Sequence, residues 1–315
     1  MIDARGRELD YLRLSVTDRC NLRCIYCMPE EGVPLVSHRQ ILRVDEILRL
    51  VGLMVEGLGV RKVRITGGEP LVRKGLEGIV KGLSQVGLDE LVMTTNGVLL
   101  EERAQGLADL GLQRVNVSLD SLRRERLSRI CRRNFGLERI LNGIEAARKA
   151  GLDPVKVNCV VLRGVNDDEV GDFIRWGMSN DLEVRFIEHM PTHLPDRMFV
   201  SIDQILQTAA ECGRVVEAQE QGGTARRFII TGTGYHFGVI APFGTDMCAH
   251  CRRIRLTAEG RLYPCLGRPE NLDLRGMVRG GYSDGEITRA ARRALSAKPE
   301  SHGGCGRIRM WRMGG

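Results

Sequence analysis

Short runs of apolar residues, or of alternating apolar and polar residues, alternate with helical segments along the first two-thirds of the chain. Six runs have the residue types of β-strands: YLRLSV from residue 11, KVRIT from 62, LVMTT from 91, RVNVSL from 114, VKVNCVVL from 155 and EVRFIE from 183. Repeated strand and helix units require a parallel sheet with helices packed outside it. Six units, rather than the eight of a closed barrel, predict an α/β fold with an open, partial (βα)6 TIM-like barrel.

Polar residues stand at the C-terminal ends of these predicted strands. They are Ser15, Thr17, Thr66, Glu69, Thr94, Asn96, Ser118, Asp120, Asn158, Glu188 and His189. In a barrel of parallel strands these ends meet at one mouth, and active sites of such folds lie there. The sequence therefore predicts the functional site at this mouth.

The pattern changes near residue 200. One helical segment, SIDQILQTAAECG, is followed by alternating runs and glycine turns such as TARRFIITGTGYHFGVIAPF. We predict a barrel domain over residues 1–200 and a smaller, mainly β domain over residues 201–315. Gly232, Gly234 and Gly238 resemble a dinucleotide-binding loop, but a strand-like run follows them, so hairpin turns are favoured.

The segment CNLRCIYC places three cysteines, Cys20, Cys24 and Cys27, after the first predicted strand. The chain shows no apolar leader and no uninterrupted membrane-spanning run, so we expect a cytoplasmic protein whose cysteines are thiols or metal ligands. A structural zinc site takes four protein ligands and a disulfide takes two. A four-iron cluster held by three thiolates keeps one iron open for another ligand. Half of a zinc knuckle, completed from elsewhere, is the alternative.

A second triad, Cys248, Cys251 and Cys265, lies in the smaller predicted domain. The intervening RIRLTAEGRLYPC is typical of a hairpin that turns near Gly260, which would return Cys265 to the other two. A zinc ribbon completed by His250 or Cys305 is the alternative to a second open cluster.

The spacing CxxxCxxC with Tyr26 before the last cysteine, together with GGEP at residues 67–70, resembles the radical S-adenosylmethionine enzymes. The second triad and the final Gly314 and Gly315 narrow the resemblance to the GTP 3′,8-cyclase family, also called molybdenum cofactor biosynthesis protein A. Seven motifs occur in the family's order: LRLSVTDRCNLRCIYCMP, VRITGGEPLVR, TTNG, VNVSLD, VKVNCVV, VRFIEHM and CAHCRRIRL. The resemblance covers nearly the whole chain.

This resemblance implies a radical S-adenosylmethionine lyase with two 4Fe-4S clusters, S-adenosylmethionine as cofactor and GTP as substrate. In the family an electron from the first cluster splits S-adenosylmethionine into methionine and a 5′-deoxyadenosyl radical. That radical takes the ribose 3′ hydrogen of GTP, and the carbon radical adds to guanine C8. Reduction then gives (8S)-3′,8-cyclo-7,8-dihydroguanosine 5′-triphosphate in the first step of molybdenum cofactor biosynthesis.

The resemblance also implies roles for particular residues. The cluster ligands would be the two cysteine triads. The S-adenosylmethionine site would be formed by Tyr26, Gly67, Gly68, Glu69, Ser118 and Met190. The GTP site would be formed by Arg13, Lys62, Arg64, Thr94, Lys156, Arg185, Arg253 and Arg255. Arg13, Arg253, Arg255, Gly314 and Gly315 would act closest to the reaction. The residues alone point the same way, because guanidinium groups on interior strands need an anion, and a triphosphate supplies one.

Expected partners are GTP, an electron donor such as flavodoxin or ferredoxin, and cyclic pyranopterin monophosphate synthase downstream; a homodimer is compatible with the resemblance. The formal charge of +7 has no polybasic block and aromatic residues are only 4%, so neither a membrane nor a nucleic acid is expected. Two alternatives are a sibling radical enzyme acting on a peptide or another small molecule, and a non-catalytic, metal-stabilised nucleic-acid binder. Cys131, Cys159 and Cys212 match no motif and are predicted to be core or incidental thiols.

Overall fold

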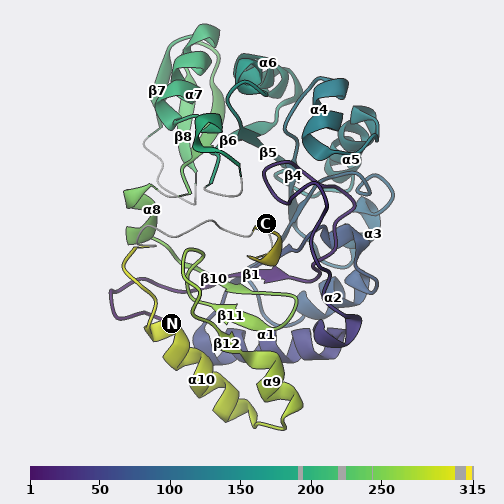
Figure 1. The fold of residues 1–315 in the computed structure, drawn as a ribbon, viewed down its shortest axis with the longest axis vertical. Helices are drawn as coiled ribbons and strands as arrows, with labels where there is room; N and C mark the ends of the chain where they lie inside the picture. Colours follow the sequence, from purple (N-terminus) through teal and green to yellow (C-terminus); the bar gives the residue numbers. More distant parts are fainter. Residues whose placement is uncertain (191–193, 219–224, 243, 302–309, 314–315) are drawn as a thin grey trace.

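The computed structural model describes residues 1–190, 194–218, 225–242, 244–301 and 310–313. Within them one sheet of twelve strands runs in the order β12-β11-β10-β1-β2-β3-β4-β5-β6-β9-β8-β7. Its strands curve around an open centre, and the helices pack on the outside (Figure 1). The predicted α/β fold with a partial barrel is therefore confirmed.

The six predicted strands form the middle of this sheet. They are β1 (Tyr11–Ser15), β2 (Lys62–Thr66), β3 (Glu90–Thr95), β4 (Arg114–Ser118), β5 (Lys156–Val161) and β6 (Glu183–Glu188). Each pairs in parallel with the next along the chain. Their C-terminal ends therefore lie at the same edge, as the alternation predicts.

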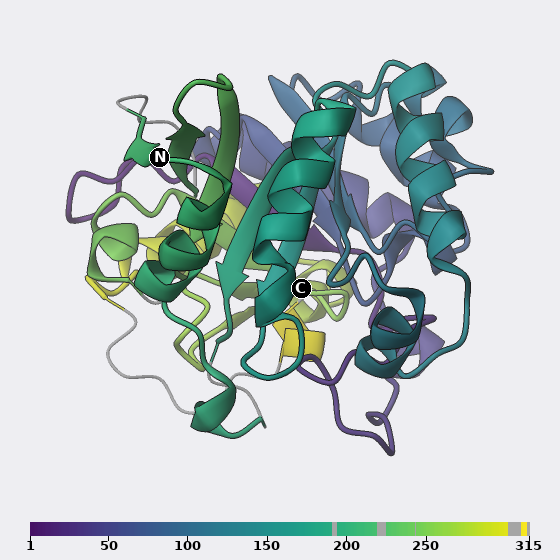
Figure 2. The ribbon, with the colours of Figure 1, turned by 90° about the horizontal axis from the view of Figure 1, so that it is seen from above.

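Helices connect these strands and cover the outer face of the sheet, as Figure 2 shows from above. They are α1 (Val44–Leu58), α2 (Leu76–Leu83), α3 (Ala104–Asp109), α4 (Arg124–Cys131), α5 (Leu137–Lys149), α6 (Val170–Asn180) and α7 (Ile202–Ala209). In α1, the residues Ile47, Val51 and Met54 recur at helical spacing and are buried. Gly59 ends this helix at φ 72°, a left-handed conformation that favours glycine.

The chain after α7 extends both edges of the sheet. Its elements are β7 (Val215–Glu217), β8 (Arg226–Ile230), β9 (Tyr235–Ile240), α8 (Thr245–Ala249), β10 (Arg253–Leu256), β11 (Arg261–Tyr263), β12 (Leu272–Asp273), α9 (Leu274–Arg279), α10 (Asp284–Ser296) and α11 (Met310–Met313). Strand β9 pairs in parallel with β6, whereas β10 pairs in parallel with β1 at the opposite edge. The C-terminal strands thus continue the barrel sheet, and the domain division at residue 200 stays a prediction.

Two hairpins proposed from the glycine turns are present. Strands β8 and β9 pair antiparallel around Gly232 and Gly234, both at positive φ, and β10 and β11 pair antiparallel around Gly260. Short 3-10 helices complete the fold: η1 (His38–Gln40), η2 (Pro70–Val72), η3 (Asp167–Glu169), η4 (Asp196–Met198) and η5 (Ala210–Cys212). No helix in the described ranges is long and apolar enough to cross a membrane.

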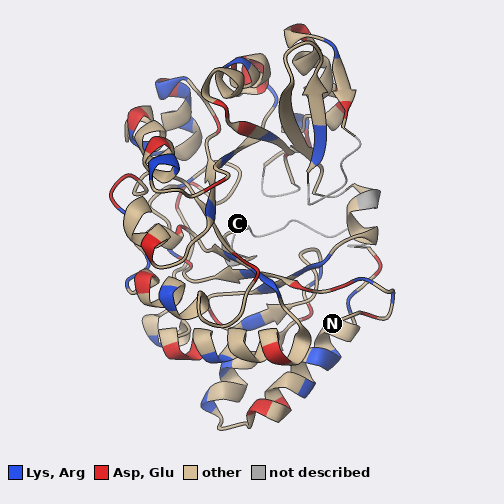
Figure 3. Ribbon diagram, turned by 180° about the vertical axis from the view of Figure 1, so that it is seen from behind, with Lys and Arg blue, Asp and Glu red and all other residues tan. Residues whose placement is uncertain are grey.

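The added strands are joined to the barrel by a buried aromatic cluster. Phe186 on β6 lies between Phe173 of α6 and Phe237 of β9, with ring centroids 6.3 and 6.1 Å away, and all three side chains are fully buried. Such edge contacts add to the hydrophobic burial. Seen from behind, lysines and arginines lie on the inner strands as well as on the outer helices (Figure 3).

Candidate active site

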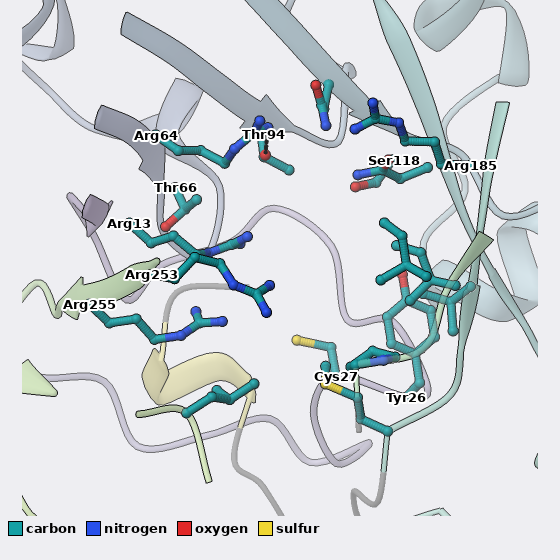
Figure 4. A pocket seen from close by; sticks show the side chains of 18 of the residues that line it. Arg13, Tyr26, Cys27, Arg64, Thr66, Thr94, Ser118, Arg185, Arg253 and Arg255 are labelled. Carbon is teal, nitrogen blue, oxygen red and sulfur yellow. Dashed lines mark hydrogen bonds between the residues drawn. The ribbon is translucent and has the colours of Figure 1, made fainter. Parts of the chain in front are cut away.

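A cavity of about 310 Å³ lies at the C-terminal ends of the parallel strands. Figure 4 shows Arg13, Arg64, Arg253 and Arg255 along one side of it, and Arg185, Tyr26 and Cys27 on the other. Most of the predicted site residues line it: Arg13, Cys20, Cys24, Tyr26, Cys27, Arg64, Gly67, Gly68, Glu69, Thr94, Ser118, Arg185, Met190, Cys248, Cys251, Arg253, Arg255 and Cys265. The sheet therefore brings the two triads and the predicted cations to one cavity.

The first triad lies on the loop after β1, and this loop is held by main-chain hydrogen bonds to the end of α4. The Arg23 amide donates to the Cys131 carbonyl at 3.0 Å, and the Ile25 amide donates to the Ile130 carbonyl at 2.9 Å. Cys24 Sγ also lies 3.9 Å from Cys131 Sγ. Helix α4 thus fixes the backbone that presents these thiols to the cavity.

The GGEP segment passes so close to the loop before the first triad that only glycine fits. A Cβ on Gly68 would lie 2.3 Å from the Arg19 carbonyl oxygen, and one on Gly67 would lie 2.9 Å from that of Thr17. The amide of Gly68 donates to the Thr17 carbonyl at 2.7 Å. Both glycines are therefore required for the backbone contact itself.

Glu69 lines the cavity, but its carboxylate is hydrogen-bonded to protein groups. Its carboxylate is 1% exposed and accepts hydrogen bonds from the Leu71 amide, the Thr95 hydroxyl and the Asn96 amide. Burial raises the pKa of Glu69 to about 7. The side chain thereby ties the loop after β2 to the loop after β3, which positions the GGEP backbone.

Replacing Gly68 with alanine is expected to weaken S-adenosylmethionine binding by about tenfold or more, because the new Cβ must displace the backbone of both loops. Equilibrium dialysis against the anaerobically prepared protein measures this. The matched control is Gly78→Ala in α2, where the nearest atom to a new Cβ is 3.8 Å away. That control should bind normally and gain about 0.5–1 kcal/mol of stability. Equal binding by the two variants would contradict the prediction.

Tyr26 is fixed by a residue outside the set of predicted ligands. Its hydroxyl donates to Asp120 Oδ2 at 2.7 Å, and the Val160 amide donates to Asp120 Oδ1 at 2.9 Å. Burial raises the pKa of Asp120 to about 6 and raises that of Tyr26 as well. Asp120 could have been selected from the sequence, because the motif VNVSLD contains it together with Ser118. Only the fold shows its contact with Tyr26.

Asn96, from the TTNG motif, supports the same loop. Its amide nitrogen lies 2.8 Å from Asn21 Oδ1 and 3.9 Å from Cys20 Sγ. The first triad is thus held from three sides, by α4, by GGEP and by the loop after β3.

The second triad comes from α8, the turn after it and the end of β11. The pairing of Arg255 with Tyr263 in the β10–β11 hairpin returns Cys265 toward Cys251, as predicted. Lys298, which follows α10 and which the sequence reasoning missed, is buried and lies with its Nζ 3.5 Å from Cys251 Sγ. Burial opposes ionisation, but the charges of Arg253 and Lys298 lower the pKa of Cys251 to about 7. Cys305 lies outside the described residues.

The thiols fit iron clusters better than single metal ions. Across the described part of the chain, no three His, Cys, Asp or Glu side chains converge closely enough to hold one metal ion. A zinc site needs its ligands around one ion, whereas a cubane binds each thiolate on a different iron and so spreads them apart. Among the described residues, the cavity is lined by the three cysteines of each triad. An open iron on each cluster therefore stays a prediction.

The cations on β10, β1 and β2 form one row. Arg13 is in register with Arg255 on one side and with Arg64 on the other. Arg255 is 6% exposed, and its pKa is lowered well below its usual range by burial and by the charges of Arg13 and Arg253. Despite burial, Arg64 and Arg13 lower the pKa of Tyr11 to about 8. A buried row of like charges is unfavourable unless it receives an anion.

Two predicted GTP residues do not line the cavity. Lys62 begins β2, pairs with Glu90, and its Nζ lies 5.1 Å from the ring centroid of Tyr11. Lys156 begins β5, and its Nζ lies 2.8 Å from Glu183 Oε2. Both stand at the N-terminal ends of their strands, so their role toward GTP stays a prediction.

Gly314 and Gly315 lie outside the described residues. The preceding Met313 is buried, and its carbonyl accepts a hydrogen bond from Arg255 Nη1 at 3.3 Å. Helix α11 therefore reaches the row of arginines, in the open centre of Figure 1. Of the cysteines that belong to neither triad, Cys131 and Cys159 are buried as predicted, and Cys212 is half-buried against α6.

Comparisons with known proteins agree with this geometry. The Radical SAM superfamily model matches residues 14–177, and the Molybdenum Cofactor Synthesis C model matches residues 182–304. The GTP 3′,8-cyclase of Heliobacterium modesticaldum is 46% identical over 310 residues, which cover 96% of this chain and 94% of that protein. The GTP 3′,8-cyclase of Thermodesulfovibrio yellowstonii is 43% identical over 307 residues, 95% of either chain.

Solved structures show the same fold at low identity. The structure of anSMEcpe with bound AdoMet has a TM-score of 0.63 at 15% identity, and the match covers 93% of this chain and 78% of that one. Streptococcus suis SuiB bound to S-adenosylmethionine has a TM-score of 0.62 at 12% identity, and covers 90% and 66%. These likenesses support the architecture of the barrel.

Proposed function

The chain belongs to the GTP 3′,8-cyclase family of radical S-adenosylmethionine enzymes, and we propose that its cavity converts GTP to (8S)-3′,8-cyclo-7,8-dihydroguanosine 5′-triphosphate. This is the first step of molybdenum cofactor biosynthesis. The observation that carries the proposal is the buried row of arginines between two cysteine triads in one cavity.

Two 4Fe-4S clusters and S-adenosylmethionine are the cofactors. Cys20, Cys24 and Cys27 would hold the first cluster, and the second triad would hold the other. When bound, the first cluster and S-adenosylmethionine supply the 5′-deoxyadenosyl radical. The protein's part is to orient the reactants.

The S-adenosylmethionine side is formed by rigid backbone. Gly68 offers main-chain groups that are fixed by the contact with Thr17, and Tyr26 offers its backbone while Asp120 holds its ring. Ser118 and Met190 line the same side of the cavity. Groups already held in place lose little entropy on binding, which favours precise positioning of the reacting atoms.

The GTP side is formed by the arginines. Planar guanidinium groups bind phosphate oxygens in pairs, and Arg13, Arg64 and Arg185 reach the cavity from three different strands. Arg253 and Arg255 lie on β10 beside the second triad, so they would place GTP between the two clusters. Thr94 accepts a hydrogen bond from Arg64 Nη1 at 3.0 Å and keeps that guanidinium directed at the cavity.

Further partners follow from this chemistry. A one-electron donor such as flavodoxin or ferredoxin would reduce the first cluster, and the product would pass to cyclic pyranopterin monophosphate synthase. A cytoplasmic location suits the cysteine content of the chain, because a reducing compartment keeps thiols available as ligands. A homodimer is compatible with this function.

The decisive experiment supplies GTP carrying deuterium at the ribose 3′ carbon, with S-adenosylmethionine and a chemical reductant, to the anaerobically reconstituted protein. We expect deuterium in 5′-deoxyadenosine and a nucleotide that has the composition of GTP but separates from it by chromatography. Unlabelled 5′-deoxyadenosine with GTP unchanged would favour the sibling enzyme acting on a peptide or another small molecule. If neither 5′-deoxyadenosine nor a new nucleotide forms, both the cyclase and the sibling radical enzyme are contradicted.

Removing Gly314 and Gly315, or replacing both with alanine, is expected to lower formation of the cyclised nucleotide by about 100-fold, since misplaced catalytic contacts cost that much. The reason is that Met313, which precedes them, contacts Arg255, a residue of the proposed GTP site. Iron content, stability and S-adenosylmethionine cleavage should not change. Product formed at the wild-type rate would show that these glycines take no part in the reaction.

A further inference from the structure

The segment around α4 is unusually basic. Six arginines lie between residues 123 and 133. Arg123 and Arg126 are paired with acids of η3 and α6, namely Asp168, Glu169 and Asp172. The others, Arg124, Arg129, Arg132 and Arg133, form no ion pair with any described residue.

Four of the arginines without an acidic partner among the described residues lie on the loop of the first triad or at the end of α4, which contacts that loop. We call Arg23, Arg129, Arg132 and Arg133 the α4 basic face. Arg132 Nη1 donates to the Met28 carbonyl at 3.1 Å, and Arg23 lies on the loop itself. Arg129 and Arg133 are exposed to solvent. The nearby acids in sequence are Glu30, Glu31 and Glu125, so the face keeps a positive excess.

The end of α4, which carries most of this face, lies against the first triad. Cys131, which stands between Arg129 and Arg133 in the sequence, is 3% exposed and lies with its sulfur 3.9 Å from Cys24 Sγ. Figure 2 shows the end of α4 beside the loop after β1. The other side of the triad faces the cavity, which S-adenosylmethionine and GTP would fill. An electron that reaches the first cluster must therefore come from the outer side.

We propose that the α4 basic face is the docking surface for a small, acidic electron-transfer protein that carries a low-potential flavin or iron–sulfur centre. This inference rests on the proposed function, because it needs a first cluster that is reduced in each turnover. One electron leaves the reduced centre of the carrier and enters the first cluster, so the carrier is oxidised by one electron and the cluster is reduced by one. No bond or proton is exchanged.

Charge is the reason to favour this partner. Complementary charges raise the association rate of transient complexes and orient the encounter, without requiring a large apolar contact. A nucleic acid would also be attracted by arginines, but the chain around α4 offers no interleaved aromatic side chains for base stacking. The binding of RNA is therefore treated as the competing outcome.

The test reverses charge at two exposed residues that touch neither the cavity nor the triad loop. The variant Arg129→Glu with Arg133→Glu is compared with Arg289→Glu with Arg293→Glu, two exposed arginines at the same spacing on α10. Helix α10 lies on the side of the molecule away from α4 (Figure 1). Both variants are prepared with full iron content. Reduction of the clusters is followed by absorbance after mixing with reduced flavodoxin, and separately with reduced ferredoxin.

We expect reduction of the α4 variant to slow by about tenfold or more at low ionic strength, and the α10 variant to match the wild type. The wild-type rate should fall as salt is added, and the α4 variant should lose most of this dependence. Dithionite, which needs no docking, should reduce all three proteins equally. Equal rates with both carriers for all proteins, or a wild-type rate that salt does not change, would overturn the proposal.

Two further results distinguish this proposal from the binding of RNA and from a failure of the proposed function. The α4 variant could instead lose binding to a short RNA duplex while both carriers reduce it at the wild-type rate. That result would identify a nucleic acid as the partner of this face and overturn the proposal. Absence of the cyclised nucleotide from wild-type protein reduced with dithionite would overturn the proposed function. The rates of cluster reduction are read independently of that product.

Discussion

Cys20→Ser protein is expected to contain about four irons, where the wild type contains about eight, and to lose S-adenosylmethionine cleavage entirely. Cys20 lines the cavity, and the Leu22 amide lies 3.4 Å from its sulfur. A serine hydroxyl gives no ligand for iron comparable to a thiolate. The second triad lies on α8, in the turn after it and just after β11, so its cluster should remain. Iron and sulfide content, with 5′-deoxyadenosine measured by chromatography, tests both parts.

The matched control for this prediction is Cys212→Ser. Cys212 is half-buried, and its contacts are Gly171 and Arg175 of α6, away from both triads. This variant should keep about eight irons and full cleavage, because it removes a thiol that binds no cluster. Stoichiometric zinc without iron in the wild type, or full cleavage by Cys20→Ser, would contradict the assignment of the first triad.

The central barrel could be predicted because its signals are local. Segments such as KVRIT and VKVNCVVL alternate with period two, while the α1 segment repeats its apolar residues with the period of a helix. Parallel pairing then follows from the long connections between strands. The placement of the later strands had no local signal. The antiparallel hairpins could be recognised, but not that β9 joins β6 while β10 joins β1 at the far edge.

The site residues were likewise predictable from local motifs, whereas the long-range contacts between them were not. The triads, GGEP and the arginines are recognised from motifs, and the cavity places nearly all of them together. The contacts that hold them were not predicted, because they join residues far apart in the chain. Lys298 reaches Cys251 across 47 positions, and Asp120 reaches Tyr26 across 94. Both contacts depend on how the sheet curves. The spacing of residues within one motif does not predict that curvature.

The pairing of β10 with β1 has the largest consequence for the substrate. It places Arg255 in register with Arg13, and Arg13 in register with Arg64, so three guanidinium groups share one row. Burial and the neighbouring charges lower the pKa of Arg13 to about 10 and lower that of Arg255 well below its usual range. Without an anion, repulsion between these guanidinium groups destabilises the fold. Such local destabilisation is often found at functional sites.

Arg255→Ala and Arg253→Ala are therefore expected to lose GTP turnover on the order of 100-fold, the usual loss when a buried charged partner is removed. S-adenosylmethionine binding should stay unchanged, because these side chains lie on β10 and not beside GGEP. Arg255→Lys should recover only part of the loss, since an ammonium group cannot bind phosphate oxygens in pairs. The matched control is Arg261→Ala on the adjacent strand β11, where the side chain pairs with Asp273.

Thermal unfolding separates lost binding from a damaged fold. GTP at 100 times its dissociation constant should stabilise the wild type and Arg261→Ala by about 2.7 kcal/mol, and should give almost no shift in Arg255→Ala. Without GTP, Arg255→Ala should unfold no earlier than the wild type, because the substitution relieves repulsion with Arg13 and Arg253. A variant that is less stable without GTP but still shifts with it would place the triphosphate elsewhere. The combination of an undamaged fold and a lost shift is what a buried cation reserved for an anionic substrate predicts.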